Sequence, residues 1–172
     1  MAAFTLAAND ASDGMAHKVT IRNDSITAHS GKTVTLVGTA YNGEALTEVV
    51  TGPGTSATVT STNYFLTLTS ATPSATIGAD TFDIGWGVDS ASAPISVRDR
   101  AGTGNSNIGF SCDVTGSPTF TLQQSYGGAW YDNATMTGKS ANTQGSLTVP
   151  AMAMRMKFSA AGTVDLHLIH HG

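Results

Sequence analysis

The chain has 172 residues, a mass of 17.6 kDa and a formal net charge of −4, and only 12% of its residues are charged, about half the usual share. Its 8 basic residues are outnumbered by 12 acidic ones, which argues against a surface that binds nucleic-acid phosphates, and no apolar run is long enough for a membrane span. We therefore expect neither nucleic acid nor a membrane as a partner. The 26 Thr, 17 Ser and 19 Gly residues replace charge as the main polar groups.

Residues 1–15 predict an extended N-terminal arm. The first residues carry no basic segment, and the polar pair at 9–10 follows too soon for a secretory signal. Phe4 and Leu6 are the large apolar side chains of this segment. We take both as candidate anchors for a protein partner.

Alternation of apolar and hydroxyl side chains is the dominant pattern of the chain. This pattern predicts strands with one buried and one solvated face, and Thr suits the solvated face because its branched Cβ favours extended backbone. We find no long stretch with helical periodicity and expect about eleven to fourteen short strands, as in a β-sandwich or barrel. The clearest examples are residues 33–37, 56–60, 64–69 and 118–123.

One turn has a strong hairpin signature. Asn42 and Gly43 separate two strand-like segments, 34–41 and 45–51. An Asn-Gly pair in this context predicts a two-residue loop in which both residues have positive φ.

A small, polar segment that ends in a proline, residues 88–94, predicts a linker. The fold class expected is therefore all-β, with two small antiparallel β-sandwich or jelly-roll-like domains in tandem. The N-terminal β domain would span residues 16–90 and the C-terminal β domain residues 94–172. One larger β-sandwich is the alternative.

The richest aromatic cluster lies around a flexible Gly-Gly pair. It contains Tyr126, Trp130 and Tyr131, which are residue types that anchor protein interfaces and stack on sugars. Three interpretations stay open: a loop folded onto its own core, a protein interface, or a glycan site.

The C-terminal region predicts two amphipathic strands. In residues 151–158, three Met residues and Phe158 share one face, which we expect in the core. Residues 163–170 form the second strand, and the short connection between them predicts a terminal antiparallel hairpin. His167, His170 and His171 crowd the end of the chain, but strand alternation separates them onto two faces, so we expect no metal site.

The sequence offers little for catalysis. Gly-Lys-Thr at 31–33 and Gly-Lys-Ser at 138–140 lack both the first glycine of a phosphate-binding loop and a following helix. No Gly-x-Ser-x-Gly motif occurs. Cys112, the only cysteine, shares a strand face with Phe110 and Val114, which predicts a buried small hydrophobe and not a nucleophile. We expect no enzyme and no cofactor.

The order of strands and turns resembles that of small structural virion proteins of tailed bacteriophages. The resemblance covers most of residues 17–169 and contains no catalytic or metal motif; it ends at 170–172, where two histidines and a glycine replace a plainer ending. The runs that carry it are 34–39, 42–53, 63–70, 94–97, 120–125, 130–137, 154–158 and 162–168.

The resemblance implies a virion role, most simply a capsid decoration (cement) protein made in the host cytoplasm and bound to the capsid exterior. Its partners would be the major capsid protein and neighbouring copies of itself. The N-terminal arm would then dock by strand addition, with Phe4 and Leu6 in the partner. A tail-associated, receptor-binding or glycan-binding component is the alternative.

Overall fold

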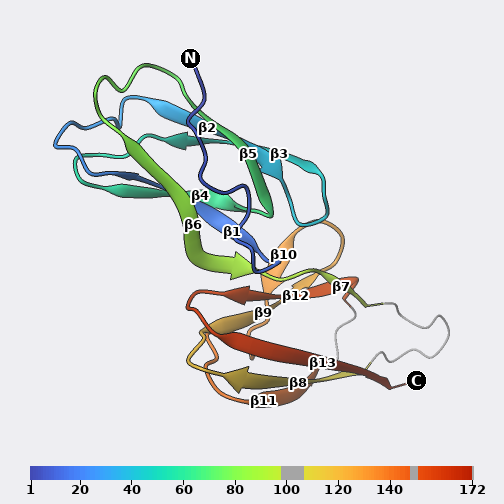
Figure 1. Ribbon diagram of the computed structural model, residues 1–172. Coiled ribbons are helices and arrows are strands. Elements are labelled where there is room, and N and C mark those ends of the chain that lie inside the picture. Colours follow the sequence, from blue (N-terminus) through green and yellow to red (C-terminus); the bar gives the residue numbers. More distant parts are fainter. Residues whose placement is uncertain (98–106, 148–150, 172) are drawn as a thin grey trace. The chain divides into compact units, whose positions relative to one another are not determined.

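The computed structural model describes residues 1–97, 107–147 and 151–171 (Figure 1). These residues form 13 strands and contain no helix, so the predicted all-β class is confirmed. Accordingly, none of the described segments is a helix that could cross a membrane. The chain divides into two compact units, unit 1 at Met1–Ala91 and unit 2 at Ser92–Gly172.

Unit 1 contains two three-stranded antiparallel arrays, in the orders β4-β1-β6 and β3-β2-β5. Each array has an alternating strand at its centre: β2 alternates along its whole length, and β1 alternates from Val19 onward, after an irregularity in its pairing. The strands are β1 (Ala16–Asn23), β2 (Thr33–Thr39), β3 (Ala45–Thr51), β4 (Thr58–Phe65), β5 (Thr67–Pro73) and β6 (Phe82–Ala91).

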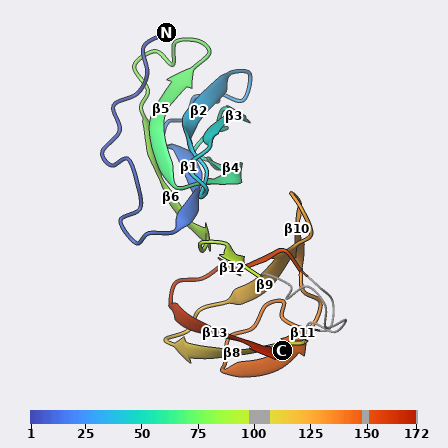
Figure 2. The ribbon, with the colours of Figure 1, turned by 90° about the vertical axis from the view of Figure 1, so that its right-hand side faces the viewer.

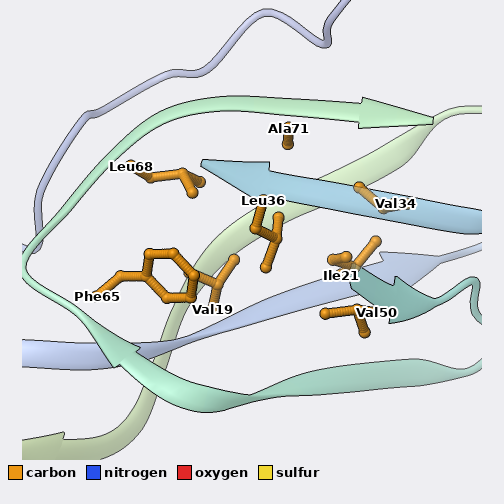
Figure 3. Packing of buried hydrophobic residues seen from close by; sticks show 8 residues of the cluster. All are labelled: Val19, Ile21, Val34, Leu36, Val50, Phe65, Leu68 and Ala71. Atoms are coloured by element: carbon orange, nitrogen blue, oxygen red, sulfur yellow. The ribbon is translucent and has the colours of Figure 1, made fainter. Parts of the chain in front are cut away.

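The core of unit 1 lies between the two arrays (Figure 3). Central strand β1 contributes Val19 and Ile21, and central strand β2 contributes Val34 and Leu36, all of them almost completely buried. Burying each such side chain contributes about 1.5–3 kcal/mol. The complete cluster is Val19, Ile21, Val34, Leu36, Val50, Phe65, Leu68 and Ala71.

The β2–β3 hairpin exists, but its turn differs from the two-residue loop that the sequence predicts. The strands pair from Thr33–Thr51 to Thr39–Ala45, and Gly43 has a φ of 81° while Asn42 does not have positive φ. The Gly43 N–H donates to the Ala40 carbonyl at 3.0 Å, and the Ala40 N–H donates to the Glu44 carbonyl at 2.8 Å. This is the three-residue hairpin loop in which a type I turn is followed by a left-handed glycine.

Unit 2 also consists of two layers of strands (Figure 2). One layer has the order β10-β9-β12, with β7 also paired to β12, and the other has the order β11-β8-β13. Both layers bury apolar side chains, among them Ile108 and Cys112 on β8 and Leu122 on β9. The strands are β7 (Ile95–Ser96), β8 (Asn107–Thr115), β9 (Phe120–Ser125), β10 (Trp130–Asp132), β11 (Thr143–Leu147), β12 (Ala153–Phe158) and β13 (Thr163–His171).

The predicted C-terminal hairpin is wrong, although both of its strands form. β12 pairs with β9 over six residues, and β13 pairs with β8 over nine. The connection between β12 and β13 therefore passes from one layer to the other, and at its end Gly162 lies against Pro118. The long registers available with β9 and β8 outweigh the local preference of a short connection for a hairpin.

The predicted Met face is correct for three of its four members. Met154, Met156 and Phe158 are buried, with exposures of 0%, 3% and 6%. Met152 is 64% exposed because it precedes the first residue of β12, where the chain is not yet part of the strand. Its position in the alternation therefore does not decide where its side chain points.

Gly38 marks a place where unit 1 has no room for a side chain. A Cβ on Gly38 would lie 1.9 Å from the Thr67 carbonyl oxygen, at an irregularity in the β2–β5 pairing. We predict that Gly38→Ala lowers the free energy of unfolding by about 2–3 kcal/mol through overpacking. The measurement is urea denaturation followed by circular dichroism.

Gly85→Ala is the matched control for this substitution. Gly85 also lies within a strand, but its nearest neighbour would be 3.7 Å from the added Cβ, so we expect a change of less than about 1 kcal/mol, in the stabilising direction. Equal destabilisation by both variants would show that the close approach of Gly38 is not the cause.

Candidate functional site

The N-terminal arm lies along the free edge of β5 in its own unit (Figure 2). The Phe4 N–H donates to the Ala71 carbonyl at 2.8 Å, and the Leu68 N–H donates to the Asn9 carbonyl at 2.7 Å. The arm therefore runs antiparallel to β5 and adds main-chain hydrogen bonds to an edge that would otherwise be open. Two main-chain hydrogen bonds thus join the arm to β5 of the same chain, although residues 1–15 form no strand of their own.

Both predicted anchors of the arm contact the core of unit 1. Phe4 and Leu6 are partly buried and pack against the core cluster, and the ring of Phe4 lies 5.6 Å from that of Phe82. The sequence expectation placed these side chains in a partner protein. Apolar side chains in an arm indicate that they pack against a hydrophobic core. The sequence alone does not show whether that core belongs to the same copy or to another.

The arm is joined to β1 by two consecutive polar turns. The Ser12 N–H donates to Asp10 Oδ1 at 2.9 Å, and the Met15 N–H donates to Asp13 Oδ1 at 2.9 Å. Ser12 has a φ of 58° and Gly14 a φ of 75°, so both lie in the left-handed region. We call residues 10–15 the hinge segment.

The hinge segment is fixed to β1 through a carboxylate. His17 Nε2 donates to Asp13 Oδ2 at 2.8 Å, while His17 Nδ1 lies 2.7 Å from the Gly87 carbonyl oxygen. Partial burial raises the pKa of Asp13, but the hydrogen bonds from the Met15 N–H and from His17 outweigh it, so the pKa of this carboxyl is below its usual value. The charged form of Asp13 therefore stabilises the folded hinge.

In unit 2, two tyrosines of the predicted aromatic cluster lie together at the β9–β10 turn. Tyr126 and Tyr131 are 43% and 54% exposed, and their ring centroids are 6.0 Å apart at a tilt of 50°. Gln124 Nε2 donates to the Tyr126 hydroxyl at 2.5 Å and so fixes one ring. The exposed Met152 brings its sulfur against Gly127 of the same turn. We call Tyr126, Tyr131 and Met152 the tyrosine patch.

Trp130 does not belong to the tyrosine patch. It pairs with Ser125 while Tyr131 pairs with Gln124, and neighbouring residues of a strand point to opposite faces. The guanidinium carbon of Arg155 lies 4.4 Å from the Trp130 ring centroid, which is a cation–π contact. The three aromatics that the sequence groups together are therefore divided between two faces of the sheet.

A polar network shares the face of Trp130, and sequence analysis did not detect it. Gln123 Nε2 donates to Asp132 Oδ1 at 2.6 Å, and Arg155 Nε donates to Gln123 Oε1 at 2.8 Å. Lys157 Nζ donates to Asp132 Oδ2 at 3.1 Å. The hydrogen bond from Gln123, together with the nearby Lys157 and Arg155 charges, holds the pKa of Asp132 below its usual value, against a smaller effect of burial. The register of three strands brings these residues together, and no spacing in the sequence reveals it.

A second network that the sequence did not reveal lies in unit 1 and is centred on the buried His29. Its Nδ1 accepts a hydrogen bond from Lys32 Nζ at 2.9 Å, and since a lysine ammonium only donates, His29 carries its proton on Nε2, which donates to Asp80 at 2.8 Å. The His29 hydrogen bond, followed by one from Ser25, lowers the pKa of Asp80. Lys32 also donates to the Thr76 carbonyl at 2.7 Å. This network connects two loops and leaves no free group for chemistry on His29.

The remaining candidate groups that the structure describes are a buried thiol and an exposed histidine. Cys112 is completely buried, and burial followed by the nearby Asp113 charge raises the pKa of its thiol to about 11, so the prediction of a buried small hydrophobe is confirmed. His167 lies 3.6 Å from Asp113 on an exposed face. Among the side chains that the structure describes, no three of His, Cys, Asp or Glu converge to hold a metal ion. The side chains of His170 and His171 lie outside the described part of the structure.

Comparison with known proteins gives no relative: no protein-family model, no curated protein and no solved structure matches the chain.

The lowered pKa of Asp132 predicts an acid-dependent loss of stability in unit 2. A carboxyl whose folded pKa lies below the unfolded value of about 3.9 stabilises the fold above that value and loses the contribution as the pH falls through the folded pKa. We predict that Asp132→Asn lowers the free energy of unfolding at pH 7 by less than about 1 kcal/mol, because the side chain is partly exposed. The deficit should shrink as the pH falls below the unfolded value of about 3.9.

Urea denaturation across this pH range, followed by tryptophan fluorescence, measures the effect. The control is Glu44→Gln, which removes a carboxylate from the exposed β2–β3 turn, outside the network. Any change that it causes in the free energy of unfolding should not follow the pH dependence of the Asp132→Asn deficit. An Asp132→Asn deficit that stays constant down to pH 2.5 would contradict the assignment of the charge to the network.

Proposed function

We propose that the chain is a structural virion protein of a tailed bacteriophage, a capsid decoration protein that binds the major capsid lattice and neighbouring copies of itself from the outside. The observation that carries the proposal is the tyrosine patch. Tyr and Met are enriched in the centres of protein interfaces, and here they lie on a short, hydrogen-bonded hairpin. A rigid group of exposed anchors binds with little loss of conformational entropy.

The low charge of the chain supports a partner that is protein. A surface whose polarity comes from hydroxyl groups pays little desolvation when it is covered, whereas ionic groups cost several kcal/mol each when buried without a partner. Many copies on a repeated lattice then require area burial and no chemistry. The resemblance to small virion proteins agrees with this function.

A tail-associated or glycan-binding role is the second candidate, and one observation favours it. The amides of Gln124 and Asn133 lie beside the tyrosines, with Asn133 Nδ2 3.3 Å from Gln124 Oε1. Aromatic rings next to amide groups are the usual composition of a sugar site. However, both amides already hydrogen-bond to protein groups, which leaves fewer donors for a sugar, so we favour the protein partner.

The decoration role predicts a high copy number in purified particles. We expect quantitative mass spectrometry of purified particles of the phage that encodes the chain to find it in numbers comparable to those of the major capsid protein, and imaging to place it on the outer shell. A few copies confined to the tail would support the second candidate. Complete absence from particles would overturn both.

The tyrosine patch predicts the effect of removing its rings. We expect Tyr126→Ser combined with Tyr131→Ser to weaken binding to particles assembled without the chain by at least tenfold, since loss of an interface anchor costs about 1–2 kcal/mol or more. Sedimentation of labelled chain with such particles measures the affinity.

Val49→Thr is the control for the patch variant. Val49 is 60% exposed on β3 of unit 1, so this change also removes exposed apolar surface but should leave binding unchanged. Equal binding of all three chains would show that the patch is not the contact. Lost binding to an array of sugars, with particle binding intact, would assign the patch to the second candidate.

A further inference from the structure

We infer that the N-terminal arm is exchangeable between copies, so that residues 1–9 of one copy lie along the β5 edge of a second copy and produce an arm-exchanged dimer. The partner is a second copy of this chain. The inference concerns the chain alone and does not depend on the virion role.

The first support is the nature of the contacts that the arm makes. They consist of two main-chain hydrogen bonds to β5 and of the partly buried Phe4 and Leu6 against the core cluster. The same arm on a second copy would find the same edge and the same core, so exchange conserves every one of these contacts. β5 pairs on its other side with β2 alone, and an empty β5 edge is a ready site for an added strand.

The second support is the strain in the hinge segment. Ser12, which is not a glycine, has a φ of 58°, and Gly14 follows with a φ of 75°. A left-handed conformation at a residue with a Cβ is unfavourable, and the tight path of this segment is what returns the arm to its own β5. A straightened hinge would release that strain and, with six residues, reach about 20 Å.

The third support is that little else holds the hinge closed. Ser12, Asp13 and Gly14 are exposed, and the contacts that retain the turns are the two bonds to Asp10 and Asp13, the bond from His17 and a long contact of 4.0 Å from Ser90 Oγ to Met15 Sδ. In the closed monomer the arm is tethered beside its site, so the monomer dominates in dilute solution. Exchange becomes favourable as the concentration of copies approaches the effective concentration of the tethered arm.

The test uses the full chain with an altered hinge. Ser12→Pro combined with Gly14→Pro forbids positive φ at both positions, because proline fixes φ near −65°. We expect this variant to be a dimer of about twice the 17.6 kDa chain mass by light scattering after size exclusion in reducing buffer. Adding Phe4→Ala should weaken the dimer at least tenfold, because the arm loses its anchor.

Gly78→Pro is the matched control. Gly78 also has positive φ, at 72°, and its N–H also donates to a side chain two residues earlier, Thr76 Oγ1, but it lies outside the hinge. We expect this variant to remain monomeric. A dimer here would mean that proline in any turn causes association, and would overturn the inference.

Two further measurements separate exchange from other association. Co-refolding of isotopically heavy and light hinge variants should give mixed dimers by native mass spectrometry, and the Leu68 amide, which donates to the arm, should stay protected from hydrogen exchange. A monomeric hinge variant, whether the Leu68 amide is protected or not, would overturn the inference, as would a dimer that is insensitive to Phe4→Ala.

If the hinge variant does not fold, arm exchange can be tested with the wild-type chain. Refolding from urea at high and at low protein concentration should give more dimer at high concentration, and Phe4→Ala should abolish the difference. Monomer at every concentration would overturn the inference. These experiments contain no virion particle, so a negative result would not contradict the proposed function. Likewise, a negative result in the particle-binding experiments would not contradict arm exchange.

Discussion

The structure depends on closing the edges of small antiparallel sheets. An edge strand presents main-chain N–H and carbonyl groups that either find partners or invite association. In unit 1, the arm closes β5 with main-chain bonds. On β4, a single side chain satisfies two edge N–H groups: the Glu48 carboxylate accepts hydrogen bonds from the N–H groups of Thr62 and Asn63 at 2.6 and 2.9 Å. An array of three strands has two edge strands and only one central strand. The contacts that cover these edges therefore determine whether the unit remains a monomer.

Three carboxylates of the chain act in the same way, as fixed acceptors. Asp13, Asp80 and Asp132 each accept hydrogen bonds from loops or neighbouring strands, and each has a lowered pKa as a result. Solvation of the surface is left to the hydroxyl groups. A chain with 12% charged residues thus uses several of its few carboxylates to hold loops and strands in place.

The period of the sequence predicted the strands and much of the core. Alternation decides which side of a strand is apolar, and it placed Cys112, Met154 and Met156 correctly. It does not decide which strand lies alongside, and for that reason the predicted pairing of β12 with β13 was wrong. This limit affected the prediction of the candidate site most. Trp130 and Tyr131 are neighbours in a strand and therefore point to opposite faces, and Gln123 lies beside Asp132 only because of the register between β9 and β10.

The arm shows why a contact between chains is hard to infer from sequence. Phe4 and Leu6 carry the same signal whether the core that receives them belongs to their own copy or to another, since the contacts are the same in both cases. Only the hinge distinguishes the two states, through the unfavourable φ of Ser12 and the tether it provides. A protein that must stay monomeric while dilute and associate when crowded gains both properties from such a hinge: the tether favours the closed arm at low concentration, and the strain reduces the cost of opening it once neighbouring copies are close. The tyrosine patch needs no such device, because its rings lie on a hairpin that is already fixed, and the binding proposed for it would depend only on meeting a complementary surface.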